Sequence, residues 1–122
     1  MGSPRSAFVL GDLRAAGLAL LVALVPVVSL WGFTVDDAFI PARYAHHLAR
    51  GVGYTFNAGQ ASSDGVTPLG YAHLLSPFAA EGALAAFVAA RWIGAVLWLA
   101  AASLLGVAMD RAGVSASSGG AQ

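Results

Sequence analysis

Two long apolar blocks with a polar segment between them organise the chain. Residues 15–33 run without a charged side chain, which is enough for a helix to cross the ~30 Å hydrocarbon core of a bilayer. Residues 83–109 form a second apolar block whose single charge is Arg91. We expect this arginine near an interface or facing other helices, because a charge at mid-bilayer costs about 2.5–3.5 kcal/mol. The pattern predicts transmembrane helices at 15–33 and 83–109.

The polar segment at 34–67 contains the periodicity of an amphipathic helix over about residues 40–50. Such a helix can lie flat on a membrane surface. Its apolar and basic positions fall on two sides of a helical wheel: Ile40, Tyr44 and Leu48 on one, and Arg43, His46 and Arg50 on the other.

Proline and glycine set the limits of this amphipathic helix. Pro41 is tolerated only in the first turn of a helix, so Asp36 and Asp37 are expected on the bend before it. Gly51 follows the last periodic residue and can adopt the left-handed conformation that ends a helix.

A short helix is predicted at 68–80, with Thr67 as N-cap, Pro68 in the first position and a kink at Pro77. Whether this helix crosses the membrane stays open, so the pattern predicts two or three spans. Residues 1–14 read as a polar leader, and the small, polar residues 110–122 as a disordered tail. The fold class is therefore all-α, with an external loop joining the spans.

Composition supports lipid as the solvent. Hydrophobic residues make up 58% and charged residues 10% of the chain, against about 45–50% and about 25% in soluble domains. The net charge is zero, which excludes the basic field of a nucleic-acid-binding protein. The absence of cysteine excludes disulfides and thiol chemistry.

Charges around the first apolar block predict its orientation. Arg5 and Arg14 precede it and Asp36 and Asp37 follow it, so the positive-inside rule places the N-terminus in the cytoplasm and segment 34–67 outside. A cleaved signal peptide, leaving a secreted globular domain, is the alternative. It would need a shorter apolar region and a cleavage site of small residues, whereas residues 29–33 are mostly bulky.

Asp36 and Asp37 are the first candidates for chemistry. Adjacent carboxylates at a lipid boundary can accept a proton from a hydroxyl or hold a divalent cation such as Mg²⁺ or Mn²⁺. The alternative is structural, because acidic residues also stabilise the start of a helix and mark where it meets water.

Basic residues of the amphipathic helix are the second candidates. Arg43 and Arg50 can bind a phosphate or pyrophosphate, or they form a solvated face that contacts lipid headgroups. His46, His47 and His73 lack zinc-site spacing, and adjacent residues point about 100° apart on a helix. A histidine metal site is therefore not favoured.

Short matches in a fixed order resemble the N-terminal part of bacterial GT-C superfamily glycosyltransferases. They are an apolar span, then Asp-Asp-Ala-Phe-Ile at 36–40, Arg-Tyr-Ala at 43–45, Leu-Ala-Arg-Gly at 48–51, Gly53, Phe-Asn at 56–57, Gly59 and Asp-Gly-Val-Thr-Pro-Leu at 64–69. The chain looks closest to the arabinofuranosyltransferase-like branch, over roughly residues 15–109. These polytopic enzymes take a sugar from a polyprenyl-phosphate donor at the bacterial plasma membrane.

The resemblance implies roles for individual residues. An acidic residue at the start of the first external loop acts as the catalytic base in that family, which implies Asp36 or Asp37, with Asp36 preferred as nearer the membrane. Arg43 is implied as a phosphate contact, and Tyr44, Arg50 and Asn57 as further substrate-binding residues.

The chain also departs from the family pattern. The family usually has Asn in place of His47, an additional residue between Thr67 and Pro68, and Trp in place of Gly70. Family members have on the order of ten spans, so we expect this chain to be a fragment or one half of a split enzyme, inactive without the remaining helices. A small non-catalytic membrane protein that binds or scaffolds a partner is the alternative.

Overall fold

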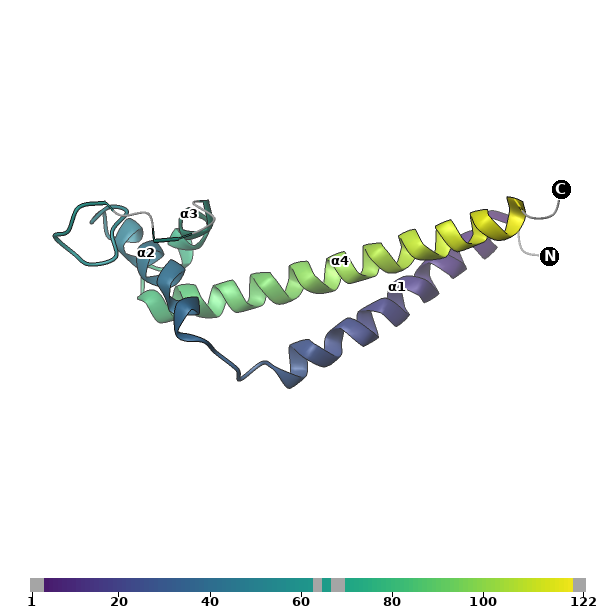
Figure 1. Cartoon of the computed structure of the whole chain (residues 1–122), viewed down its shortest axis with the longest axis horizontal. Coiled ribbons are helices and arrows are strands. Elements are labelled where there is room, and N and C mark those ends of the chain that lie inside the picture. Colours follow the sequence, from purple (N-terminus) through teal and green to yellow (C-terminus); the bar gives the residue numbers. More distant parts are fainter. Residues whose placement is uncertain (1–3, 63–64, 67–69, 120–122) are drawn as a thin grey trace. The chain divides into compact units, whose positions relative to one another are not determined.

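The computed structural model of the chain describes residues 4–62, 65–66 and 70–119. This part of the chain is all-α and contains no strand, as the sequence predicts. It divides into two compact units, Met1–Gly32 with Ala95–Gln122, called the helical pair below, and Phe33–Gly94, called the connecting unit. The elements in order are α1 (Pro4–Ser29), η1 (Asp36–Ala38), α2 (Phe39–Ala49), α3 (Gly70–Leu75), η2 (Ser76–Phe78) and α4 (Ala83–Gly119) (Figure 1).

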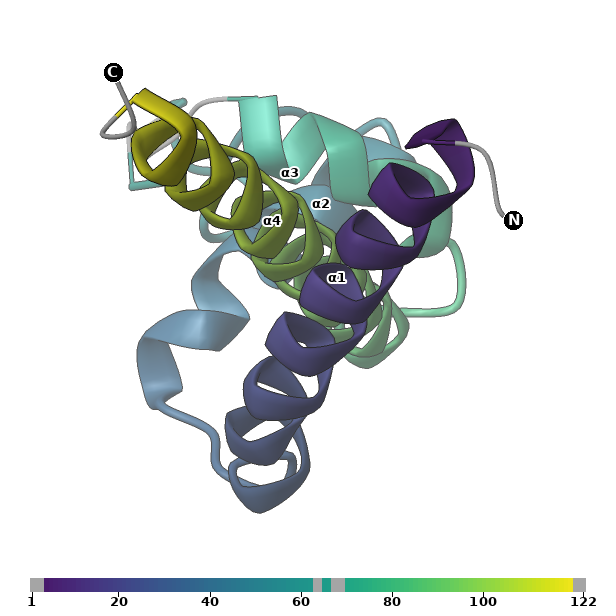
Figure 2. The same ribbon diagram turned by 90° about the vertical axis from the view of Figure 1, so that its right-hand side faces the viewer.

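Helix α1 begins earlier and ends earlier than the span predicted at 15–33. It runs from Pro4 to Ser29, and Figure 2 shows it as one continuous helix. The predicted leader at 1–14 is therefore helical from Pro4, a residue that suits the first position of a helix. At its other end the helix continues three residues past Pro26, to Ser29.

Helix α4 is longer than the apolar block that predicts it. It continues to Gly119, whereas the sequence pattern predicts a disordered tail from Asp110. Arg111 forms an ion pair with Asp12 of α1, which holds the helix in place beyond the apolar block.

Two helices are long and apolar enough to cross a membrane, over Val9–Ser29 of α1 and Ala83–Gly113 of α4. Only 6% and 0% of their most apolar windows are buried within the protein, so neither resembles the core helix of a soluble domain. Helix α3 has six residues, far fewer than the roughly 20 that a span needs. Of the two or three predicted spans, the structure thus contains two candidates in the region it describes.

The two helices of the helical pair run antiparallel (Figure 1) and contact each other at separate points. Near one end, Arg111 donates two hydrogen bonds to the Asp12 carboxylate, at 3.1 and 2.8 Å. Further along, Gly106 lies so close to α1 that an added Cβ would stand 2.7 Å from the Ala15 carbonyl oxygen and from the Ala19 Cβ. Small residues therefore allow the two backbones to approach, as they do in membrane helix pairs.

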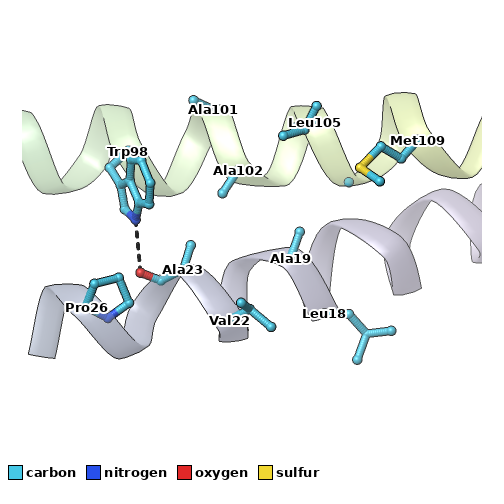
Figure 3. A pocket seen from close by; sticks show the side chains of 11 residues that line it. Leu18, Ala19, Val22, Ala23, Pro26, Trp98, Ala101, Ala102, Leu105 and Met109 are labelled. Atoms are coloured by element: carbon cyan, nitrogen blue, oxygen red, sulfur yellow. Dashed lines mark hydrogen bonds between the residues drawn. The ribbon is translucent and has the colours of Figure 1, made fainter. Parts of the chain in front are cut away.

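A hydrogen bond joins α4 to the turn of α1 that Pro26 disturbs (Figure 3). The indole Nε1 of Trp98 donates to the carbonyl oxygen of Ala23 at 3.0 Å. Pro26 has no backbone N–H for the carbonyl of Val22, four residues earlier, and the indole bonds the next carbonyl of that turn from the neighbouring helix. The contact sets Trp98 opposite Pro26 and contributes about 0.6–1.7 kcal/mol on the scale of interhelical bonds in membranes.

The ion pair between Asp12 and Arg111 predicts a charge-reversal result. Asp12→Arg should slow the pairing of α1 with α4, because two arginines then repel each other, and adding Arg111→Asp should restore it. The chain has no cysteine, so disulfide formation between cysteines placed at Ala19 and Ala102 measures the pairing. If the single and double variants cross-link at the same rate, the ion pair does not guide the pairing.

The connecting unit is built around α2. Two alanines of α2, Ala42 and Ala45, are buried against Leu75, Ala79, Ala86 and Phe87. Phe39 stacks on Phe87, with ring centroids 4.4 Å apart. On another side of α2, Tyr44 packs with Val66 and Ala72. Burial on both sides explains why a helix of eleven residues, marginal alone in water, is held in place here.

The limits of α2 agree with the sequence prediction. Pro41 lies in the first turn, and Asp36 and Asp37 lie on η1, the tight turn before the helix. Gly51 has a φ of 69° and its N–H bonds the Leu48 carbonyl at 3.0 Å. A residue with a side chain is strained in this left-handed conformation, so glycine ends the helix here. The predicted start of the next helix at Thr67 and Pro68 lies outside the described residues.

Candidate functional site

A cavity of about 440 Å³ lies in the connecting unit beside α2. Asp36 reaches it from η1, and Arg43, His46 and His47 reach it from successive turns of α2. The remaining lining is apolar and comes from Phe39, Ile40, Phe56 and Ala83. The cavity thus combines one carboxylate, one guanidinium and two imidazoles with an apolar wall.

Arg43 is positioned by the turn that follows α2. Its guanidinium carbon lies 4.6 Å from the centroid of the Phe56 ring, and its Nη2 donates to Asn57 Oδ1 at 3.0 Å. Asn57 in turn donates from Nδ2 to Gln60 Oε1 at 3.0 Å. The bond from Arg43 to Asn57 uses one of the five N–H groups of the guanidinium. The other N–H groups remain for a ligand in the cavity.

His46 and His47 are each tied by Nδ1 to a backbone carbonyl. Nδ1 of His46 lies 2.9 Å from the Ala79 oxygen, and Nδ1 of His47 lies 2.7 Å from the oxygen of Thr55. A carbonyl oxygen only accepts hydrogen bonds, so Nδ1 is the donor in both rings. These two bonds hold α2 against the end of η2 and against the turn at residues 53–57.

The two predicted catalytic carboxylates differ in position. Asp36 lines the cavity, and its side-chain carboxylate has no hydrogen-bond partner among the residues that the structure describes, so the carboxylate oxygens can accept a proton or a hydrogen bond from a hydroxyl. Asp37 is exposed on η1 and does not line the cavity. Of the two carboxylates only Asp36 therefore lines the cavity, and its role as the base stays a prediction.

The predicted substrate-binding residues fall into two groups. Arg43 lines the cavity, and Asn57 supports it through their hydrogen bond. Tyr44 is 1% exposed and its ring lies 4.6 Å from that of Tyr54, so it belongs to the core behind the cavity. Arg50 is exposed in the turn after α2 and does not line the cavity. The sequence periodicity placed Arg43 and Arg50 together, but the helix ends at Ala49.

The donor set offers little to a metal ion. Within the described ranges, no group of three or more histidine, cysteine, aspartate or glutamate side chains could hold one. The predicted Mg²⁺ or Mn²⁺ between Asp36 and Asp37 stays a prediction, and no chemical step below depends on it.

One ionisable group of the connecting unit, Tyr71, has a shifted pKa. Burial raises the pKa of the Tyr71 phenol, which packs against the buried cluster under α2. Its hydroxyl is therefore protonated throughout the neutral range and serves as packing rather than as a base.

His46 and His47 are the cavity residues that the sequence reasoning set aside. The sequence signal for these two histidines is their helical spacing from Phe39, Ile40 and Arg43. Positions three, four, seven and eight apart share one helix face, and the lining residues of α2 follow that spacing. The sequence reasoning instead tested them only as metal ligands.

Comparisons of the chain with models of known protein families, with curated proteins and with solved structures gave no match.

Proposed function

We propose that this chain forms the N-terminal part of a membrane glycosyltransferase that takes a sugar from a polyprenyl-phosphate donor. The observation that carries the proposal is the shared cavity of Asp36 and Arg43. The sequence resemblance assigns these two residues different roles in one reaction, base and phosphate contact. Their common cavity supports that assignment, since both roles require groups that reach the same substrates.

The chemistry of the proposal is an inverting transfer. The Asp36 carboxylate accepts the proton of an acceptor hydroxyl as that oxygen attacks the anomeric carbon of the donor sugar. The bond between the anomeric carbon and the phosphate oxygen breaks, and its electron pair leaves with the polyprenyl phosphate. The guanidinium of Arg43 stabilises the charge on this leaving group through bidentate or single hydrogen bonds. Further helices of a longer or split enzyme would complete the donor site.

The antiparallel helical pair supports a topology. If α1 and α4 both cross the bilayer, Asp12 and Arg111, which form an ion pair, emerge on the same side. The positive-inside rule makes that side the cytoplasm, and the segment with the cavity then lies outside a bacterial plasma membrane. In this topology α2 lies at the outer surface of the bilayer, where a lipid-linked donor and an extracytoplasmic acceptor can meet.

A non-catalytic membrane protein that binds or scaffolds a partner is the second candidate. The contacts within the helical pair favour it, because Trp98, Gly106 and Arg111 bind α4 directly to α1. Such contacts stabilise a hairpin without further helices. The two candidate functions differ in whether the residues of the cavity catalyse sugar transfer.

Deletion of the gene from its host tests the proposal. We expect membranes of the deletion strain to lose transfer of labelled sugar from a polyprenyl-phosphate donor to an extracytoplasmic acceptor, and the restored gene to recover it. The measurement is label incorporated per milligram of membrane protein. Unchanged transfer across the donors tested would contradict the glycosyltransferase proposal. If the chain is a scaffold, a restored gene that carries Asp36→Asn should also recover transfer. This result would distinguish the scaffold from the glycosyltransferase.

A further inference from the structure

The two adjacent histidines of α2 each keep one ring nitrogen uncommitted at the cavity. Nδ1 of each ring donates to a backbone carbonyl, of Ala79 for His46 and of Thr55 for His47. Nε2 of neither ring has a hydrogen-bond partner among the described residues. Both residues line the cavity, and the backbone bonds fix how each ring is turned.

The permanent positive charge of the cavity lies on α2, the helix that also carries the two rings. Arg43 lines the cavity with the histidines, and Asp36 is the one acidic group in the lining. Imidazole gains a positive charge between pH 8 and pH 5, which then makes Nε2 a donor. The elements packed around the rings carry further ionisable groups: Asp36, Asp37, Tyr71, His73, Glu81 and Arg91. Of these six, only Asp36 lines the cavity.

We propose that His46 and His47 bind a phosphodiester together with Arg43, through Nε2 of each ring, and that this binding tightens as the imidazoles protonate. Arg43 supplies a permanent positive charge and the histidines supply charge-assisted hydrogen bonds that depend on pH. The cavity then has an anion-binding side formed by α2 and a hydroxyl-binding side formed by Asp36. This inference rests on the proposed function for the identity of the phosphodiester as a lipid-linked sugar donor.

The apolar lining agrees with a phosphodiester that carries an organic group. Phe39, Ile40 and Phe56 add apolar surface next to the charged groups, and the Phe56 ring already stacks under Arg43. An inorganic anion would use only the polar groups. A prenyl or glycosyl phosphodiester would use both, so it should bind more tightly than a small diester.

A purely structural role for the histidines is the alternative, and substitutions can separate the two roles. The side-chain amide of asparagine places its nitrogen near the position of Nδ1, so His46→Asn and His47→Asn keep a donor for the backbone carbonyl and remove Nε2. Glutamine places its nitrogen near Nε2 and removes the Nδ1 donor. The asparagine variants should therefore retain the fold and lose the ligand contact.

Binding to the purified full chain in maltoside micelles, which contain no phosphate, tests the proposal. The probes are dimethyl phosphate, a short-chain prenyl phosphodiester and phosphatidylglycerol, whose single negative charge stays constant from pH 6 to pH 8. By calorimetry we expect the unaltered chain to bind the prenyl diester about 10-fold more tightly at pH 6 than at pH 8. We expect each asparagine variant to bind about 10-fold more weakly at pH 6, with a flatter pH profile.

Each outcome either supports or overturns the proposed phosphodiester site. Asparagine variants that bind with unchanged affinity and unchanged pH dependence overturn the proposal. Tightest binding of phosphatidylglycerol supports the phosphodiester site and overturns its assignment to a sugar donor. If a variant fails to fold, nitrogen NMR of the histidine rings in the unaltered chain decides: the Nε2 resonances of His46 and His47 move on addition of diester, or the proposal is wrong. None of these readouts requires sugar transfer, so they can fail while the deletion experiment succeeds, and the reverse.

Discussion

Replacing Asp36 by asparagine is expected to lower the rate of sugar transfer by about 10²–10⁴-fold, the usual contribution of a general base. Asparagine has nearly the shape of aspartate but cannot accept the proton of the acceptor hydroxyl. Asp36 is exposed and its carboxylate makes no hydrogen bond within the described residues, so the change should leave the fold intact. The measurement is initial rate in membranes of a strain whose own gene carries Asp36→Asn.

The control for Asp36 is a carboxylate of the same connecting unit that lies away from the cavity. Glu81 is exposed and does not line the cavity, so Glu81→Gln removes the same charge and should leave the rate within about twofold, as for most surface changes. Asp37→Asn is the discriminating variant. A greater loss from Asp37→Asn than from Asp36→Asn would move the base to Asp37, and full activity of both variants would contradict the proposed mechanism.

Local signals predicted the cavity-bearing helix well. Pro41 and Gly51 act through their own backbone geometry, so the start and the end of α2 follow from two residues. The position of Asp36 on the turn before the helix follows from the same proline. These features depend on residues close in sequence, where propensity and capping rules apply directly.

Features that depend on distant residues were predicted less well. The helical parts of residues 1–14 and 110–122 are polar enough to suggest a leader and a tail, but Asp12 and Arg111 pair across the two helices. His47 similarly depends on the carbonyl of Thr55, and His46 on that of Ala79. The pattern of residues within one segment cannot predict these contacts, because each joins two distant segments. The sequence therefore identified the helix that forms the cavity but missed two of the four ionisable groups that line it, His46 and His47.

Replacing Gly106 by alanine is expected to destabilise the helical pair by about 1–3 kcal/mol, the usual cost of overpacking. The new Cβ would lie 2.7 Å from the Ala15 carbonyl oxygen and 2.7 Å from the Ala19 Cβ, closer than atoms approach in contact. Both neighbours belong to or lie directly on the backbone of α1, so they cannot turn away. The measurement is the free energy of unfolding of the chain in mixed micelles titrated with sodium dodecyl sulfate.

Gly113 provides the matched control, because it lies on the same helix two turns later and an added Cβ there meets nothing within 4 Å. Alanine favours a helix over glycine by up to about 1 kcal/mol, so Gly113→Ala should raise the free energy of unfolding or leave it unchanged. The same propensity gain acts at Gly106, which means that any loss there measures the contact with α1. Opposite signs at the two positions are therefore expected. Equal shifts in the same direction would show that α1 and α4 do not approach each other at Gly106.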